Sequence, residues 1–420
     1  MRVWVLSDGE TLPVEADGRR MRSWMLAESL VARGHDVVWW ASTFSHFRKR
    51  FLYDGDACVD VGPRLQLQLL DCGGYRRHFS VARYLHHRRL GSRFREVARL
   101  RPVPDVIVSA YPKIDMAYEA LRYARRHGLR VIVDVRDLWP ETYLDNVPTA
   151  IRPVVRTALG RDFRRAQTIF HDADALVAMS SGVLRWAQTF GRRTNTAEDR
   201  LFHIGYPAEV ASDAPRPDYL PACSVVVAYV GSFGGSYELD TICEAAQRLA
   251  QAGRRDIVFV LAGDGPRRAE LTARLAGVST VVFPGWLNHD GARRLLAHAD
   301  VGLIPWNSIP DAMPNKVFEY LAAGLPLLSS LTGEMETIID RSRIGYTYRA
   351  RDVEQLIRLL RSLADDPGAR RSMAEHARRL FRAQFRSSDI YEGYARHVER
   401  VRLGQSAPTD AARPVAMSPA

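Results

Sequence analysis

Several features that would assign this chain to a class are missing from it. Only three of its 59 basic residues are lysines: Lys49, Lys113 and Lys316. No run of about eighteen apolar residues occurs, so no membrane-spanning helix is predicted. The four cysteines form no CxxC pair, which favours incidental reduced thiols over a zinc site or a disulfide framework. The opening residues lack the apolar core of a signal peptide, so we expect a cytoplasmic protein.

The composition is otherwise that of a folded protein. Hydrophobic residues make up 46% and charged residues 25% of the 420 positions, which is ordinary for a globular chain. That length predicts two or three domains. The net charge of +11 and a pI of about 9.7 suit nucleic acid, an anionic membrane or phosphorylated ligands. Because arginine is the usual basic residue here, each lysine is informative.

Near-continuous apolar runs alternate with helical patterns along most of the chain. In the first half, VWVLS, HDVVWWAS, PDVIVSA and LRVIVDV are such runs, which is typical of parallel sheets buried on both faces. The pattern restarts at VVVAYVGSF. We therefore predict an α/β fold with two doubly wound parallel-sheet domains that face each other across a cleft, where such sheets bind ligands.

The predicted boundaries follow from breaks in this pattern. A proline-containing segment without periodicity separates the two halves, and small polar residues end the chain, as in linkers and disordered tails. The predicted parts are a first domain at 1–207, an interdomain linker at 208–223, a second domain at 224–387, a final helix at 388–403 that crosses back to the first domain, and a disordered tail at 404–420.

The most informative stretch is IPDAMPNKVFEYLAAGLPLLSS at 309–330. Pro314 suits the first turn of a helix, and Asn315 is a good N-cap. A helix N-terminus favours an anion, and Lys316 adds a compact charge suited to phosphate. Glu319, one turn later, suits hydroxyl donors such as those of a ribose. Together they predict a nucleotide diphosphate site; the alternative is an exposed Lys316–Glu319 pair on a surface helix.

Turns that contain glycine follow several predicted strands of the second half. VGSFGG and LAGDGP would let the backbone approach a ligand, although each is a weak signal alone. We include in the predicted donor site Gly231, Ser232, Phe233, Gly263 and Trp286.

An ordered series of motifs in the second half resembles the nucleotide-sugar domain of glycosyltransferase family 4, the retaining enzymes of GT-B fold. The series is YVGSF, LAGDGP, FPGW, ADVGLIPW and PNKVFEYLAAGLPLLSS. In the first half, RSWMLAESLVARGHDV, VDVRDLWPE and HDADALVAMSSG resemble the acceptor domain of that family more loosely. The resemblance implies two Rossmann-like domains over about residues 1–400.

The same resemblance implies roles for particular residues. The family has two glutamates with seven residues between them; the second falls on Glu319 and would hold the ribose, and the first falls on Asp311, which would face the transferred sugar. The basic pair that many members place after the first glycine turn is absent here, so Lys316 is the candidate replacement that neutralises the leaving diphosphate. Met313, Pro314 and Asn315 complete the predicted donor set.

The implied reaction moves a sugar from a nucleotide-diphosphate sugar, with UDP favoured over GDP, to a hydroxyl of a lipid-linked saccharide, polysaccharide or other glycoconjugate, with retention, without a metal and without a cofactor. Polysaccharide assembly for the cell envelope is the implied context. A nucleotide-sugar epimerase and a non-catalytic binding protein are alternatives. An NAD-dependent oxidoreductase is disfavoured because no GxGxxG follows the first strand, and glycoside hydrolysis by two carboxylates leaves the lysine unexplained.

The first half offers acceptor-side candidates. Asp137 ends a predicted strand and either orients the acceptor or sugar, as a third catalytic residue, or caps a helix or pairs with Arg136. Arg136 is itself a predicted acceptor-side residue. The loop at 8–20, with Gly18 and Arg19, either closes over the acceptor or is an ordinary loop. DGD at 54–56 and DAD at 172–174 resemble metal-binding DxD pairs but lie in the wrong half, and the histidines at 86–87 are expected at the surface.

Residues 76–101 hold nine arginines, with Leu90, Phe94, Val97 and Leu100 at helical spacing. A basic amphipathic helix suits an anionic membrane surface, which would place the protein on the inner face of the plasma membrane. The alternative is a core-facing stripe with solvated arginines. No nucleic-acid-binding motif occurs, so we expect no nucleic-acid partner.

Overall fold

The computed structural model describes residues 1–15, 20–77, 80–145, 147–210, 214–222, 224–307 and 311–405. The chain divides into two compact units. The first unit comprises Met1–His203 and the residues from Ser388 onward, and the second comprises Ile204–Ser387. The described part of the predicted linker belongs to the second unit, where Leu220 is buried in the core. The predicted tail lies outside the described residues from position 406 onward.

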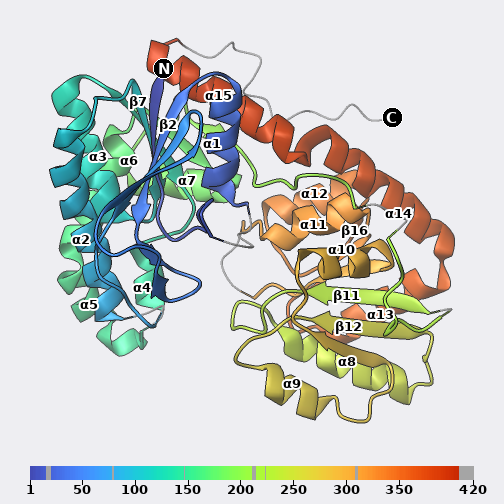
Figure 1. Ribbon diagram of the computed structural model, residues 1–420. Helices are drawn as coiled ribbons and strands as arrows, with labels where there is room; N and C mark the ends of the chain where they lie inside the picture. Colours follow the sequence, from blue (N-terminus) through green and yellow to red (C-terminus); the bar gives the residue numbers. More distant parts are fainter. Residues whose placement is uncertain are drawn as a thin grey trace. The chain divides into compact units, whose positions relative to one another are not determined.

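The first unit is built on an eight-stranded sheet in the order β10-β9-β8-β7-β1-β2-β6-β5 (Figure 1). Neighbouring strands are parallel except for the antiparallel pair β5–β6. The chain proceeds from β1 outward to one side and then resumes on the other side with β7, so the strand order reverses between β1 and β7. The strands are β1 (Arg2–Leu6), β2 (Asp36–Ser42), β5 (Ala57–Gly62), β6 (Leu65–Leu70), β7 (Val106–Tyr111), β8 (Arg130–Val135), β9 (Ala175–Ala178) and β10 (Arg200–Leu201), with a separate hairpin of β3 (Phe44–Ser45) and β4 (Arg50–Phe51).

Helices cover both faces of this sheet. Side chains that alternate along β1 divide between two cores, with Trp4 and Leu6 in one and Val3 and Val5 in the other. The first core contains residues of α2, α3, α6 and α7, and the second contains residues of α1 and α15. The helices are α1 (Arg22–Ala32), α2 (Val81–Val97), α3 (Ile114–His127), α4 (Glu141–Asp145), α5 (Arg152–Ala158), α6 (Gly160–Asp172), α7 (Ser181–Phe190) and α15 (Ser387–Leu403).

The last helix of the chain completes the first unit. Tyr391, Tyr394 and Val398 of α15 are buried in the same core as α1 and β1. The predicted return of the final helix to the first domain is therefore confirmed. Burial of this apolar face, rather than local helix propensity, holds a C-terminal helix in place.

The second unit has a six-stranded sheet, parallel throughout, in the order β13-β12-β11-β14-β15-β16. Helices α8 and α13 contribute to the core on one face, and α10, α11, α12 and α14 to the core on the other. Both units are thus doubly wound, as the sequence predicted. The strands are β11 (Val225–Val230), β12 (Ile257–Ala262), β13 (Val281–Gly285), β14 (Val301–Ile304), β15 (Leu327–Ser329) and β16 (Gly345–Thr347). The helices are α8 (Leu239–Gln251), α9 (Arg268–Arg274), α10 (His289–Ala297), α11 (Asn315–Ala323), α12 (Glu334–Ser342), α13 (Val353–Asp365) and α14 (Pro367–Leu380).

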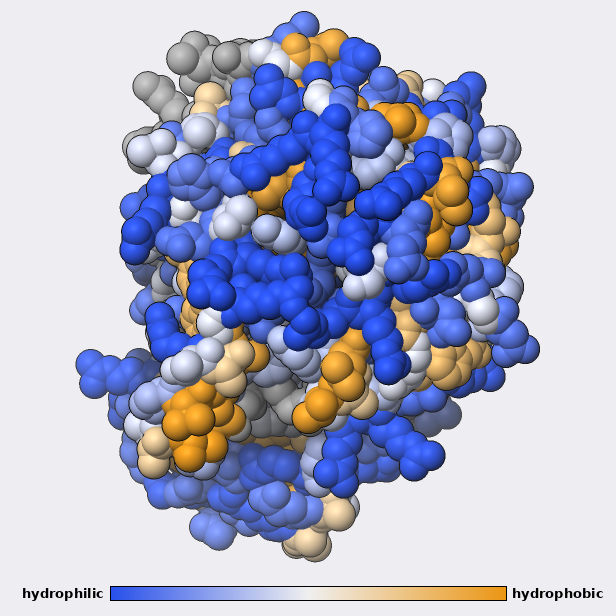
Figure 2. Space-filling model, turned by 90° about the vertical axis from the view of Figure 1, so that its left-hand side faces the viewer, coloured by the Kyte–Doolittle hydropathy of each residue, from blue (hydrophilic) through white to orange (hydrophobic). Residues whose placement is uncertain are grey.

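The basic helix α2 uses its apolar stripe in the core. Leu90 and Phe94 are fully buried, whereas Leu100 beyond the helix is 83% exposed. The surface prediction for the histidines was wrong: His86 and His87 are both buried, because residues three and four positions apart place them on the same helix face as Leu90. On the face drawn in Figure 2, hydrophilic side chains cover most of the surface, and small separate apolar groups lie in both its upper and its lower part.

Among the residues that the structure describes, no helix is both long enough and apolar enough to cross a bilayer.

Candidate functional site

Two glycine turns meet at the carboxyl ends of β11 and β12. The amide of Gly231 donates to the carbonyl of Ala262 at 2.9 Å, and that of Phe233 donates to the carbonyl of Asp264 at 2.9 Å. Gly263 has a φ of +155°, and a Cβ added there would overlap the carbonyl oxygen of Gly231. The turns therefore pack backbone against backbone, which only glycine permits at this position.

The other predicted residues of these turns differ in accessibility. Ser232 is exposed, and Trp286, directly after β13, is 71% exposed. Phe233 is buried to 99% and packs on Tyr229 and Phe283. A side chain enclosed in that way belongs to the core, so Phe233 can offer a ligand little more than its backbone.

Helix α11 begins directly after a proline. Pro314 is the N-cap, with φ −67° and ψ 149°, and Asn315 is the first helical residue. The predicted order was wrong by one position, because the fixed φ of proline also fits the extended N-cap. Gly324, with φ +68°, ends the helix, and Met313, before it, is buried in the core.

The ammonium group of Lys316 is enclosed by two tyrosine rings. Its Nζ lies 3.8 Å from the ring centroid of Tyr229 and 3.5 Å from that of Tyr237. The side chain is about 95% buried, and Nζ has no hydrogen-bond partner among the residues that the structure describes. Burial lowers the pKa of Lys316 well below its usual value, against the opposing charge of Glu319. This burial excludes the alternative of an exposed ion pair.

The lysine lies next to the first glycine turn. A Cβ added at Gly231 would be 2.8 Å from the Nζ of Lys316, so a side chain there would press on the ammonium. The hydroxyl of Tyr320, on the same helix, accepts a hydrogen bond from the amide of Val230 at 2.9 Å. Burial, followed by the charge of Glu319, raises the pKa of Tyr237 to about 12. Helix α11 therefore brings Lys316 and Glu319 to the turn that follows β11.

Asp311 has a contact that the sequence did not predict. Its φ is +56°, and its Oδ1 accepts a hydrogen bond at 2.9 Å from the amide of Glu334, the first residue of α12. A carboxylate at this place stabilises a helix N-terminus. Asp311 therefore stabilises the N-terminus of α12, and this role is independent of any contact with a ligand.

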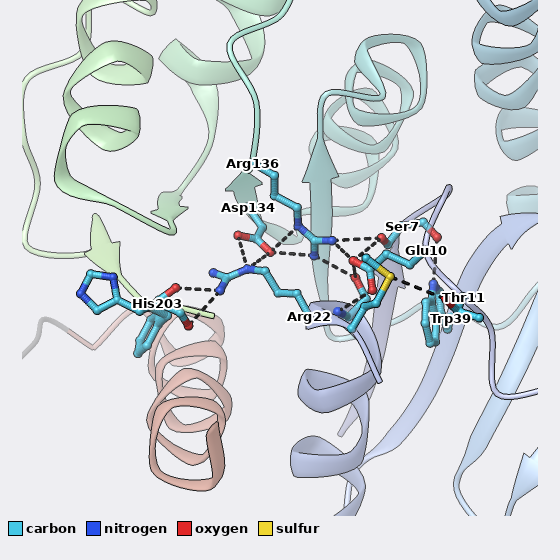
Figure 3. A network of polar contacts seen from close by, with 11 residues as sticks. Ser7, Glu10, Thr11, Arg22, Trp39, Asp134, Arg136 and His203 are labelled. Atoms are coloured by element: carbon cyan, nitrogen blue, oxygen red, sulfur yellow. Dashed lines mark hydrogen bonds and ion pairs between the residues drawn. The ribbon is translucent and has the colours of Figure 1, made fainter. Parts of the chain in front are cut away.

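In the first unit, Arg136 belongs to a network of charges (Figure 3). Its guanidinium pairs with Glu10 and, at 2.8 Å, with Asp134. Asp134 is fully buried and also contacts the Nε of Arg22 at 2.8 Å, while Arg22 donates to the carbonyl of Phe202 at 2.7 Å. Burial lowers the pKa of Arg136 to about 10. Its charge is thus balanced within the domain.

The remaining acceptor-side predictions have mixed outcomes. Oδ1 of Asp137 accepts from the amide of Leu138 at 2.8 Å and from Thr142 at 3.4 Å, which fits the capping alternative better than a pair with Arg136. Burial raises the pKa of its carboxyl. Gly18 and Arg19 lie outside the described residues.

The two acidic triplets pair with arginines. Asp56 of DGD contacts Arg93, and Asp172 and Asp174 of DAD contact Arg125 and Arg130. Over the described parts of the chain, no group of three or more histidine, cysteine, aspartate and glutamate side chains could hold a metal ion.

Sequence reasoning missed Tyr229 and Tyr237, which enclose Lys316, because aromatic residues near strand ends are common. It also missed a cluster around Lys49 and Lys113 in the first unit. The scarcity of lysine was the available signal for that cluster.

Comparison with known proteins gives one family match for each half. Residues 18–198 match the family described as glycosyl transferase 4-like domain, and residues 224–366 match glycosyl transferases group 1. Together they span most of the chain.

Two curated relatives come from Streptomyces kanamyceticus. A 2-deoxystreptamine glucosyltransferase is 27% identical over 164 residues, which are 38% of this chain and 42% of the relative. An alpha-D-kanosaminyltransferase is 24% identical over 271 residues, 63% of this chain and 64% of the relative. The chain therefore spans less than two thirds of the length of these relatives.

Solved structures agree over nearly the whole chain. Sucrose-phosphate synthase from Thermosynechococcus elongatus superposes with a TM-score of 0.74 at 18% identity, covering 96% of this chain and 100% of the other. WaaG, a glycosyltransferase involved in lipopolysaccharide biosynthesis, gives 0.64 at 19% identity, with 95% and 99% covered. HepE from Anabaena, in complex with UDP, gives 0.64 at 13% identity, with 95% and 100% covered. These likenesses show the GT-B fold.

The packing of the glycine turns predicts unequal effects for two substitutions. Gly277→Ala strains a φ of +83° in open space and should cost about 1–2 kcal/mol. Gly263→Ala adds overlap with the Gly231 carbonyl and should cost about 2–5 kcal/mol. Urea unfolding of both variants measures this difference in stability. Equal losses of stability would mean that the turns at Gly231 and Gly263 are not in contact.

Proposed function

Starting from a chain that carries both glycosyltransferase domains of the GT-B fold, we propose that it transfers a sugar from a nucleotide-diphosphate sugar, with UDP as the favoured nucleotide, to an acceptor hydroxyl with retention of anomeric configuration. One observation carries this proposal. The enclosed ammonium of Lys316 lacks a hydrogen-bond partner and lies beside the glycine turn at Gly231, one helical turn from Glu319. Neighbours of the same fold are described as bound to UDP, UDP-glucose and UDP-2-fluoro glucose.

The donor would bind across the carboxyl edge of the second sheet. The amides at the start of α11 and the charge of Lys316 suit the diphosphate. The carboxylate of Glu319 suits the ribose hydroxyls, and Gly231 and Gly263 let the backbone approach the ligand. Ser232, Asn315 and the exposed Trp286 complete the proposed site.

Stabilisation of the leaving group would be the main catalytic contribution. As the bond from the anomeric carbon to the diphosphate breaks, the acceptor oxygen bonds to that carbon from the same face and its proton passes to the leaving phosphate oxygen. The negative charge that develops on the diphosphate is then balanced by Lys316 and the helix N-terminus. Such donors, fixed before the reaction, commonly contribute about 10²–10³ in rate each. In this scheme no metal or cofactor is required.

Two aspartates have proposed roles beside this centre. Asp311 would orient a hydroxyl of the transferred sugar. Asp137, whose carboxyl pKa is raised by burial, would act on the acceptor side in the first domain. Analysis of reaction products separates transfer from the alternatives, since an epimerase needs no acceptor and a binding protein forms no product.

Lys316→Met tests the donor site in two opposite directions. The unliganded protein buries an ammonium without an acceptor among its described residues. The free energy of unfolding of the variant should therefore be about 0.5–2 kcal/mol higher than that of the native chain. UDP at about 100 times its Kd should stabilise the native chain by about 2.7 kcal/mol, and this gain should disappear in the variant.

Thermal unfolding with and without UDP, in the presence and absence of EDTA, gives both quantities. Arg164→Met, an exposed change in α6, serves as the control. If the variant is stabilised by UDP as much as the native chain is, Lys316 is not part of the donor site.

Two variants separate the capping role of Asp311 from the role of its negative charge. Asp311→Asn keeps a good capping side chain and should change stability by only a few tenths of a kcal/mol, whereas Asp311→Ala should cost about 1 kcal/mol. If the carboxylate contacts the sugar, both variants should lose turnover to a similar extent. If Asp311→Asn is instead fully active and only the less stable Asp311→Ala loses turnover, the role of Asp311 is limited to stabilising α12.

We further propose that the acceptor is a lipid-linked or other glycoconjugate saccharide and that the protein acts at a membrane surface. Val81 and Leu85 of α2 are 75% and 43% exposed next to its arginines, although Leu90 and Phe94 of the same helix are buried. Sedimentation with phosphatidylglycerol vesicles should therefore be lost at high salt and weakened in Val81→Asp. Equal binding to phosphatidylcholine vesicles would contradict this surface.

A further inference from the structure

The other two lysines of the chain lie together in the first unit. Lys113 follows β7, and Gly9 follows β1. The strand order reverses between these two strands, and open α/β sheets bind ligands at the carboxyl ends of strands where that reversal occurs. A Cβ added at Gly9 would lie 3.4 Å from the Nζ of Lys113, so the lysine approaches the loop after β1.

Lys113 is already balanced by neighbours. Its Nζ lies 3.5 Å from Oδ2 of Asp8 and 3.1 Å from Nε2 of His87. Against the effect of burial, Lys113 and His86 lower the pKa of Asp8 well below its usual value. Oδ1 of Asp8 accepts from the hydroxyl of Ser42 at 2.6 Å. This carboxylate is therefore fully engaged and has little capacity for another cation.

Lys49 is in a different situation. Its Nζ lies 4.7 Å from the ring centroid of Tyr75 and is enclosed, with no hydrogen-bond partner within the described ranges of the chain. The guanidinium of Arg83 lies 5.8 Å from the same ring and 5.0 Å from that of Trp139. Burial and then the like charge of Arg83 lower the pKa of Lys49. Both cations thus lie against the ring of Tyr75, and Lys49 has three hydrogen-bond donors that no residue in the described part of the chain accepts.

An anionic ligand would satisfy this arrangement. An ammonium left without an acceptor costs free energy that a charged acceptor recovers. A lysine supplies a point charge, and an arginine supplies a planar fork that matches a pair of phosphate oxygens. A phosphate offers enough oxygens to meet both groups at once, whereas a carboxylate has only two.

We propose that Lys49 and Arg83 bind a phosphate ester of the acceptor at the carboxyl edge of the first sheet, over the rings of Tyr75 and Trp139. The identification of this ligand as the acceptor rests on the proposed transferase function. The proposal that this site binds phosphate is independent of the transferase function. The acceptor class is thereby narrowed to saccharides or lipids that carry a phosphate.

Thermal unfolding of the full chain at constant ionic strength tests the subsite, with inorganic phosphate as the probe and saturating UDP present. The variants are Lys49→Gln, Arg83→Gln and Lys316→Gln, and the control is Arg164→Gln, an exposed arginine of α6. Phosphate should raise the melting temperature of the native chain, the control and Lys316→Gln. In Lys49→Gln and Arg83→Gln its apparent affinity should fall about tenfold or more.

Two controls keep a negative result informative. Because Nζ of Lys49 has no hydrogen bond to lose among the described residues, Lys49→Gln should unfold without ligand at or slightly above the native temperature; if it unfolds below it, Lys49→Met replaces it. Glucose 6-phosphate should act as phosphate does, whereas glucose and glucuronate should not. Equal effects of glucuronate and glucose 6-phosphate would overturn the phosphate assignment.

The source of the phosphate is distinguished by a parallel arm. Loss of glucose 6-phosphate binding in Lys49→Gln indicates a soluble phosphorylated sugar, and loss only of phosphatidylglycerol vesicle binding indicates a lipid headgroup; either supports the subsite. Phosphate stabilisation that survives in Lys49→Gln but vanishes in Lys316→Gln would overturn it. If UDP has no effect on the native chain while phosphate acts through Lys49, the subsite stands and the proposed transferase function fails.

Discussion

The buried carboxylate of Asp134 is the interaction on which the first domain depends. It is fully enclosed at the end of β8, and Arg22 at the start of α1 and Arg136 in the following loop both donate to it. Arg22 extends the contact to the backbone at Phe202 and His203 and lies 5.4 Å from the ring of Tyr394 in α15. One carboxylate therefore joins the strand, the first helix, the exit of the chain from this unit and the helix that returns to it. Removing either partner from such a pair leaves an uncompensated charge in the interior.

The arginines of this network show why the three lysines differ. An arginine with carboxylate partners has its charge paired within the fold, as Arg22 and Arg136 do. Lys49 and Lys316 instead have their ammonium groups over tyrosine rings and without acceptors. A ring face attracts a cation but accepts no strong hydrogen bond. These two lysines thus retain donors for a ligand, one at a strand edge in each domain.

The fold could be predicted from the sequence because parallel strands buried on both faces leave continuous apolar runs. The position of Lys316 at the start of a helix followed from Pro314 and Gly324, which act locally. The contacts that the sequence did not predict join residues distant in sequence: Asp311 accepts from the amide of Glu334, and Phe233 packs on Phe283. His86 and His87 were expected at the surface because arginines surround them in sequence. In the structure they are buried, and their rings contact the carbonyl of Gly73 and the Nζ of Lys113, respectively. No local pattern encodes these partners.

The lysine argument applied to Lys316 could have been extended to the whole chain. If arginine is the usual basic residue, each lysine marks a place where a guanidinium does not fit or where its fork would find no partner. Such a residue weakens the unliganded fold, since burial lowers the pKa of both Lys49 and Lys316. An anion bound at either ammonium would offset that cost. If both proposed sites hold, ligand binding and stability are coupled at Lys49 and Lys316, and these two residues would select the proposed substrates by charge.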